Sequence, residues 1–132
     1  MKHDMFNRVL VWELLAQIHG AALRIARRFK TVRSVDDWLL SEEGIERLDG
    51  ICMLLIAIGE SLKKLDRMTE QKLLIQYPQV DWKSAKGMRD VLSHQYFSLD
   101  AEAVFDVCRQ DIPILIETLE RIMNAVKNGS AS

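Results

Sequence analysis

The stretch RDVLSHQY, residues 89–96, places an arginine, an acid, a serine, a histidine and a tyrosine close together. Histidine titrates near neutrality and can transfer protons, while arginine binds phosphate groups and stabilises a pentacoordinate transition state. No cluster of carboxylates that could bind Mg²⁺ accompanies them. A histidine and an arginine without such a cluster fit metal-independent cleavage of RNA, in which the substrate's own 2′-hydroxyl is the nucleophile. The residue types alone also fit a surface ion pair between the histidine and the acid four residues before it.

The spacing of these residues raises a geometrical problem. Arg89 and His94 are five positions apart, which is about 140° of rotation on a helix, so a continuous helix would place them on different faces. Arg89, Ser93 and Tyr96 share one side, with Ser93 as a supporting residue. Asp90 and His94 share an adjacent side, so the acid can orient the imidazole and stabilise its charged form. Unwinding of the last helical turn, or a twofold axis between two chains, would bring the histidine to an arginine.

The elements that must position this stretch are predicted to be helices. Apolar residues recur every three or four positions over 10–29, 45–65 and 104–126. The segment 45–65 carries two apolar stripes, so it is expected to be buried on more than one side. Pro113 lies inside the last segment without disturbing its phase. That pattern predicts a kinked helix in which the carbonyl of Arg109 loses its partner.

Residues 89–96 themselves are expected on a helix that begins after an Asp81 cap, at Trp82, and ends near Phe97. Its inward stripe would consist of Trp82, Ala85, Met88 and Leu92. A helical turn is expected over 34–40, and a short helix over 69–78 that stops before Pro78.

The sequence therefore predicts an all-α fold: an up-and-down bundle of about four main helices with short extra helices. Residues 1–127 form a single domain, Asp100 caps the last helix, and residues 128–132 form a flexible tail. Cys52 and Cys108 lie in apolar segments and in no metal-ligand spacing, which favours buried, reduced thiols and predicts no metal site and no cofactor.

The composition excludes some classes of protein. The net charge of −1 does not indicate a general nucleic-acid binder. The longest apolar run, residues 51–59, is shorter than the roughly 20 residues that a membrane span requires, and the N-terminus lacks the features of a signal peptide. We therefore expect a cytoplasmic protein with no membrane partner.

At residues 89–96 the sequence resembles the HEPN superfamily, because Arg89, His94 and Tyr96 match its Arg-x4-His-x-Tyr motif. It looks most like the HepT branch, the toxins of HepT/MntA toxin–antitoxin pairs. Three flanking blocks agree with that branch: AIGESLKKL at 57–65, the Pro…Trp…Gly-Met-Arg pattern within 77–100, and VFDVCRQDIPILIETL at 104–119. The resemblance covers roughly residues 8 to 125.

The resemblance implies a homodimeric, metal-independent endoribonuclease with the motif helices facing a shared cleft. His94 would be the acid/base and Arg89 the ligand of the phosphate and the transition state. Asp90 would orient or tune the site, at a position where the family often has Asn. It also implies that an MntA-like nucleotidyltransferase antitoxin adds AMP to Tyr96 and so silences the toxin. The basic segments 24–33 and 63–72 are then predicted RNA or antitoxin surfaces.

Two other interpretations remain open at the level of sequence. The chain could be a non-catalytic module that partners a nucleotidyltransferase and binds nucleotide or protein. The motif could instead be structural and stabilise the dimer. The RNA target is not identified by any residue pattern.

Overall fold

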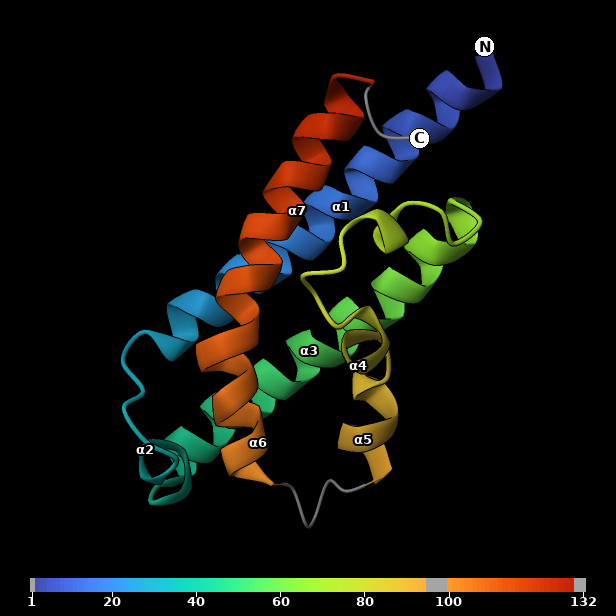
Figure 1. The fold of residues 1–132 in the computed structure, drawn as a ribbon. Helices are drawn as coiled ribbons and strands as arrows, with labels where there is room; N and C mark the ends of the chain where they lie inside the picture. Colours follow the sequence, from blue (N-terminus) through green and yellow to red (C-terminus); the bar gives the residue numbers. More distant parts are fainter. Residues whose placement is uncertain (1, 95–99, 130–132) are drawn as a thin grey trace.

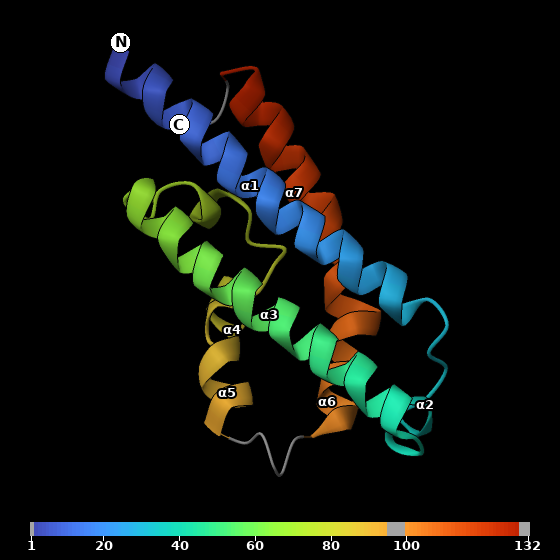
Figure 2. The same ribbon diagram turned by 180° about the vertical axis from the view of Figure 1, so that it is seen from behind.

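Three long helices form the body of the protein (Figures 1 and 2). In the computed structural model, which describes residues 2–94 and 100–129, α1 (Lys2–Phe29) runs antiparallel to α3 (Glu42–Met68) and to α7 (Ile112–Lys127). Helix α1 packs against both of the others. Their fully buried side chains include Leu15, Ile18, Ile25, Ile51, Leu62, Leu65, Leu119 and Ile122. The predicted all-α bundle is thus confirmed, with the short helices α4 (Trp82–Lys86) and α5 (Met88–His94) in the place of a fourth long one.

The helix starts follow from local capping. After the short α2 (Asp36–Leu39), the Ser41 side chain accepts a hydrogen bond from the Gly44 N–H at 2.9 Å and begins α3. Asp100 accepts one from the Ala103 N–H at 3.1 Å and begins α6 (Ala101–Asp106), as predicted. Each cap satisfies a backbone donor that has no partner within its own helix.

The chain from α6 to α7 is helical without a break. A π-helical turn, η3 (Val107–Asp111), joins α6 (Ala101–Asp106) to α7, and Pro113 sits in the first turn of α7. Proline has no N–H to donate, and the wider register of the π turn absorbs this loss just before it. The prediction of one helix rather than two separate ones is confirmed, while the kink and the unpartnered carbonyl of Arg109 stay predictions.

The short helix predicted over 69–78 is wrong. Glu70 and Gln71 have left-handed backbone angles, with φ of 52° and 61°, and the Gln71 N–H bonds back to the Asp66 carbonyl at 2.8 Å. These residues end α3 and turn the chain, so only the 3₁₀ turn η1 (Leu74–Gln76) forms beyond them. Helical propensity over this stretch is overridden by the turn.

The two cysteines are free and buried, as predicted. Burial raises the pKa of Cys52 to about 11, with the charge of Asp49 contributing, and the pKa of Cys108 to about 12. Because the thiolate is the reactive form, both side chains act as small apolar core groups.

Residues 7–29 of α1 are long and apolar enough to span a membrane by length and composition. A core helix of a soluble protein meets the same criterion, and α1 contributes several side chains to the core against α3 and α7. The absence of a membrane partner stays a prediction.

Candidate active site

The candidate site depends on how closely α4 (Trp82–Lys86) approaches α3. Asp81 caps α4 as predicted, accepting from the Ser84 N–H at 3.1 Å, and the Trp82 indole N–H donates to the Tyr77 carbonyl at 2.8 Å. Gly59 lies at the contact between the two helices. A Cβ at that position would be 2.8 Å from the Ala85 carbonyl oxygen, so only glycine permits this approach.

Replacing Gly59 by alanine is therefore expected to lower the free energy of unfolding by about 1–3 kcal/mol, because the new methyl group must push α4 away from α3. Gly20→Ala is the matched control, since a Cβ at Gly20 meets no atom within 4 Å. That change should be neutral or stabilise the protein by about 0.5–1 kcal/mol, as alanine favours helix. Urea unfolding of the two variants measures both effects. Equal stabilities would contradict the close contact.

The single helix predicted from Trp82 to about Phe97 is wrong in one respect. Gly87, with φ of −81° and ψ of 0°, separates α4 from α5 (Met88–His94), and the Asp90 N–H bonds to the Gly87 carbonyl in the tighter i→i+3 pattern at 3.1 Å. Glycine has little helical preference, which lets the chain change direction here (Figure 1). The predicted inward stripe survives the break: Trp82 and Leu92 are buried, and Ala85 and Met88 pack against the core.

Arg89 lies in the first turn of α5 and reaches back to α3. Its Nη1 donates to Glu60 Oε1 at 2.8 Å, and Lys63 Nζ lies 3.2 Å from the other carboxylate oxygen. The hydrogen bond from Arg89 lowers the pKa of Glu60 most, and the hydrogen bond from Lys63 lowers it further. More than half of the Arg89 side chain, 58%, remains exposed, so the guanidinium is oriented but still accessible.

The remaining predicted site residues are placed only in part. Asp90 is exposed in the first turn of α5, and the backbone of Ser93 and His94 forms its end. The side chains of Ser93 and His94, and the whole of Tyr96, lie outside the described residues. The pairing of Asp90 with His94, and the approach of His94 to Arg89, stay predictions. Arg89 and His94 do belong to one helix, so the angular separation of about 140° applies to its backbone.

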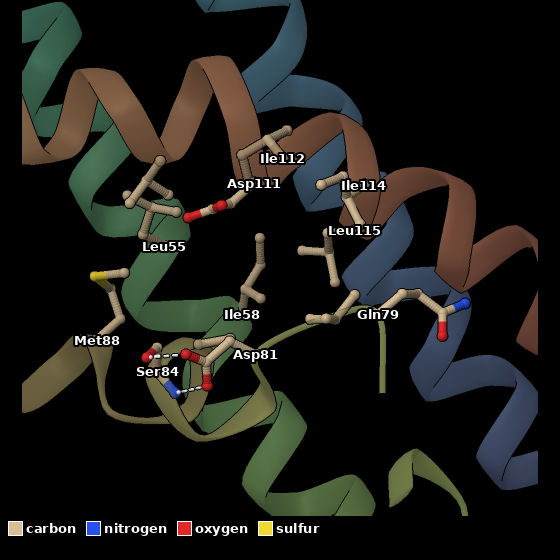
Figure 3. A pocket seen from close by; sticks show the side chains of 13 residues that line it. Leu55, Ile58, Gln79, Asp81, Ser84, Met88, Asp111, Ile112, Ile114 and Leu115 are labelled. Atoms are coloured by element: carbon tan, nitrogen blue, oxygen red, sulfur yellow. Dashed lines mark hydrogen bonds between the residues drawn. The ribbon is translucent and has the colours of Figure 1, made fainter. Parts of the chain in front are cut away.

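A cavity of about 210 Å³ lies between α3, α4 and the segment from η3 to α7 (Figure 3). Its walls are mainly apolar, and the carboxylates of Asp81 and Asp111 stand beside it. Apolar walls and two acids are unsuited to a phosphate group. The cavity is therefore not a site for the RNA backbone.

Sequence reasoning missed Glu60 as a site residue. Its only signal was the Gly59-Glu60 pair within the block that resembles the HepT branch. The contact with Arg89 spans 29 positions and depends on the packing of α4 against α3. Within the described ranges, no three His, Cys, Asp or Glu side chains gather in an arrangement that could hold a metal ion.

Comparison with known proteins identifies the family of the chain. The family model described as "Ribonuclease HepT-like" matches residues 10–122. "Putative RNase MJ1216" of Methanocaldococcus jannaschii is 34% identical over 70 residues, which is 53% of this chain and 54% of that protein. "Probable ribonuclease HepT" of Thermococcus cleftensis is 33% identical over 65 residues, 49% of this chain and 56% of that protein.

The chain spans about half the length of the curated relatives that it matches. No solved structure gives a significant match.

Proposed function

Because the chain belongs to the ribonuclease HepT-like family, we propose that it is a metal-independent endoribonuclease and the toxin of a toxin–antitoxin pair. The observation that carries the proposal is the state of Arg89. It is held by Glu60, exposed to solvent, and placed on the same short helix as His94. An oriented and accessible guanidinium is what a phosphodiester substrate requires.

In the proposed reaction His94 removes the proton from the substrate's 2′-hydroxyl, and the oxygen attacks the adjacent phosphorus. The bond from phosphorus to the 5′-oxygen breaks, and that oxygen takes up the proton that His94 removed, which returns His94 to its basic form. The products are a 2′,3′-cyclic phosphate and a free 5′-hydroxyl. Arg89 neutralises the charge on the non-bridging oxygens as the pentacoordinate state forms. Asp90 orients the imidazole from one turn earlier in α5.

Glu60 acts in this scheme as a positioning residue for Arg89. A guanidinium carries five N–H donors in a fixed planar fork, and Glu60 uses one of them, on Nη1. The remaining donors can meet two phosphate oxygens at once. The carboxylate thus fixes the direction of the fork without occupying all of it.

We expect the active form to be a homodimer. Arg89 and His94 lie on one helix at an angle that separates them, and a twofold axis through this face of α5 would bring the histidine of one chain to the arginine of the other. Exposed apolar side chains support an interface on these helices, since Val91 of α5 is 53% exposed and Met53 of α3 is 70% exposed.

The proposed regulator is an MntA-like nucleotidyltransferase that transfers AMP from ATP to the hydroxyl of Tyr96, with release of pyrophosphate. Tyr96 lies two residues beyond the end of α5. A bulky, anionic AMP group there would compete with the RNA phosphate for Arg89 and repel the RNA strand.

Expression in bacterial cells tests the toxin proposal. The wild type should arrest growth, His94→Ala should not, and co-expression of a cognate nucleotidyltransferase should restore growth. Tyr96→Phe should stay toxic in the presence of that partner because it has no hydroxyl to modify. The wild type should also be shown to be soluble and to bind the nucleotidyltransferase. If such protein is harmless to the cells, the toxin proposal is wrong, and a non-catalytic binding module would be the better description.

A further inference from the structure

A row of basic residues lies on α3 next to the contact between Glu60 and Arg89. Lys63, Lys64 and Arg67 follow Glu60 at three, four and seven positions, so they share the side of the helix that receives Arg89. We call these three residues the basic strip. Seven residues of helix rise by about 10 Å, which is the axial rise of about three stacked nucleotides in one strand.

The acids near the basic strip are already paired. Glu60 is shared between Arg89 and Lys63. Asp66 is buried, at 8% exposure, and pairs with Lys86 of α4. Lys64 and Arg67, by contrast, are exposed, and within the described ranges neither forms an ion pair with a carboxylate. Their charges are available to an external anion.

We infer that the basic strip binds the RNA backbone beyond the scissile phosphate. Lys64 and Arg67 would contact phosphates on one side of the phosphate that Arg89 binds. The inference rests on the proposed ribonuclease function and adds a subsite to it. Lysine and arginine contacts to phosphates supply affinity without sequence specificity. The strip would therefore set how long an RNA must be to bind well, and not which base is cleaved.

The surface favours a polyanion over a protein partner. Among the described residues between 54 and 74, no large hydrophobic side chain is exposed. Protein interfaces are built around apolar anchors and contain few lysines at their centre. Lys64 and Arg67, two exposed cations without a carboxylate partner among the described residues, continue from the arginine proposed to bind the scissile phosphate, and this arrangement fits a nucleic-acid strand better.

The experiment measures binding of a fluorescein-labelled, single-stranded 12-nucleotide RNA by anisotropy, with every protein carrying His94→Ala to prevent cleavage. Lys64→Ala/Arg67→Ala is compared with Arg121→Ala/Lys127→Ala, which removes the same charge from exposed positions of α7. The strip variant should bind about tenfold more weakly at low salt, and the slope of log K against log salt should fall by about 1.4, or about 0.7 for each lost phosphate contact. The α7 variant should match its parent.

Equal binding by the strip variant and its parent would overturn the subsite, and so would an equal loss in the α7 variant. A cleavage assay of the same proteins with His94 restored tests the ribonuclease proposal separately from the binding subsite. For the strip variant, kcat/KM should fall far more with the 12-nucleotide RNA than with a dinucleotide. Failure of the wild type to cleave either substrate would overturn the ribonuclease proposal, while the binding data still decide the basic strip.

Discussion

His94→Ala should lower the rate of RNA cleavage by a factor of about 100 to 10,000, the range that a positioned acid or base contributes. The variant loses the group that removes the 2′-hydroxyl proton, while Arg89 and its contact with Glu60 are retained. Single-turnover cleavage of a short RNA measures the effect on the chemical step directly. The loss should appear in the rate constant of that step and much less in the affinity for RNA, because the imidazole acts mainly in the transition state.

The control for His94→Ala is a urea unfolding measurement, which shows whether the variant is folded. Alanine has a higher helix propensity than histidine, so the variant should unfold at a urea concentration no lower than that of the wild type. His94→Gln gives a second form that keeps a polar side chain but cannot serve as a base near neutral pH. Cleavage at the wild-type rate by either folded variant would exclude His94 as the acid/base.

Arg89→Ala should lower the cleavage rate by about 100- to 1,000-fold, because it removes the group that neutralises the developing charge on the phosphate. Arg89→Lys should recover only part of this loss, since an ammonium supplies the charge but not the planar fork. Equal activity in the lysine variant and the wild type would mean that charge alone matters and that the orientation by Glu60 does not.

The role of Glu60 is tested by a double-mutant cycle with Arg89. Glu60→Gln keeps the size of the side chain but removes the charge that aligns the guanidinium, and it should reduce kcat by roughly tenfold. In the Arg89→Ala background the same change should have almost no further effect, because there is no guanidinium left to align. Independent, multiplicative losses would show that Glu60 acts on something other than Arg89.

The ion pair between Glu60 and Arg89 should depend on pH only in the acidic range. The pKa of this carboxyl is lowered, so the ion pair is fully formed above the ordinary titration range of glutamate and is lost only as the pH falls through the lowered value. If cleavage activity falls between pH 7 and pH 5.5, protonation of a group other than Glu60 causes the loss. Histidine is the side chain type that titrates in this range.

Much of the fold could be predicted because it is encoded locally. Two apolar stripes predicted that α3 is buried on more than one side, and Asp81 and Asp100 predicted two helix starts. The break at Gly87 could not be read in the same way, since the inward stripe keeps its phase across it. The turn after α3 was missed because left-handed angles at Glu70 and Gln71 leave no apolar pattern.

The candidate site divides along a similar line. The motif around Arg89 and His94 is contiguous in the chain, so its residue types suggested proton transfer and phosphate binding, and the resemblance to the HepT branch assigned the role of each residue. The spacing did not explain how the two side chains meet, and their approach stays a prediction. Glu60 is distant in sequence, and its contact with Arg89 exists only because Gly59 lets α4 pack closely on α3. A tertiary contact of this kind is set by packing and not by any local pattern.

In the proposed mechanism, Arg89 and His94 promote attack of the 2′-hydroxyl on the phosphodiester without a metal ion. The most direct measurement is cleavage of a defined RNA by the wild type and by His94→Ala in excess EDTA, with the 3′ ends of the products identified. We predict that only the wild type cleaves and that its products end in a 2′,3′-cyclic phosphate. Products ending in a 3′-hydroxyl, or cleavage that EDTA abolishes, would contradict the account.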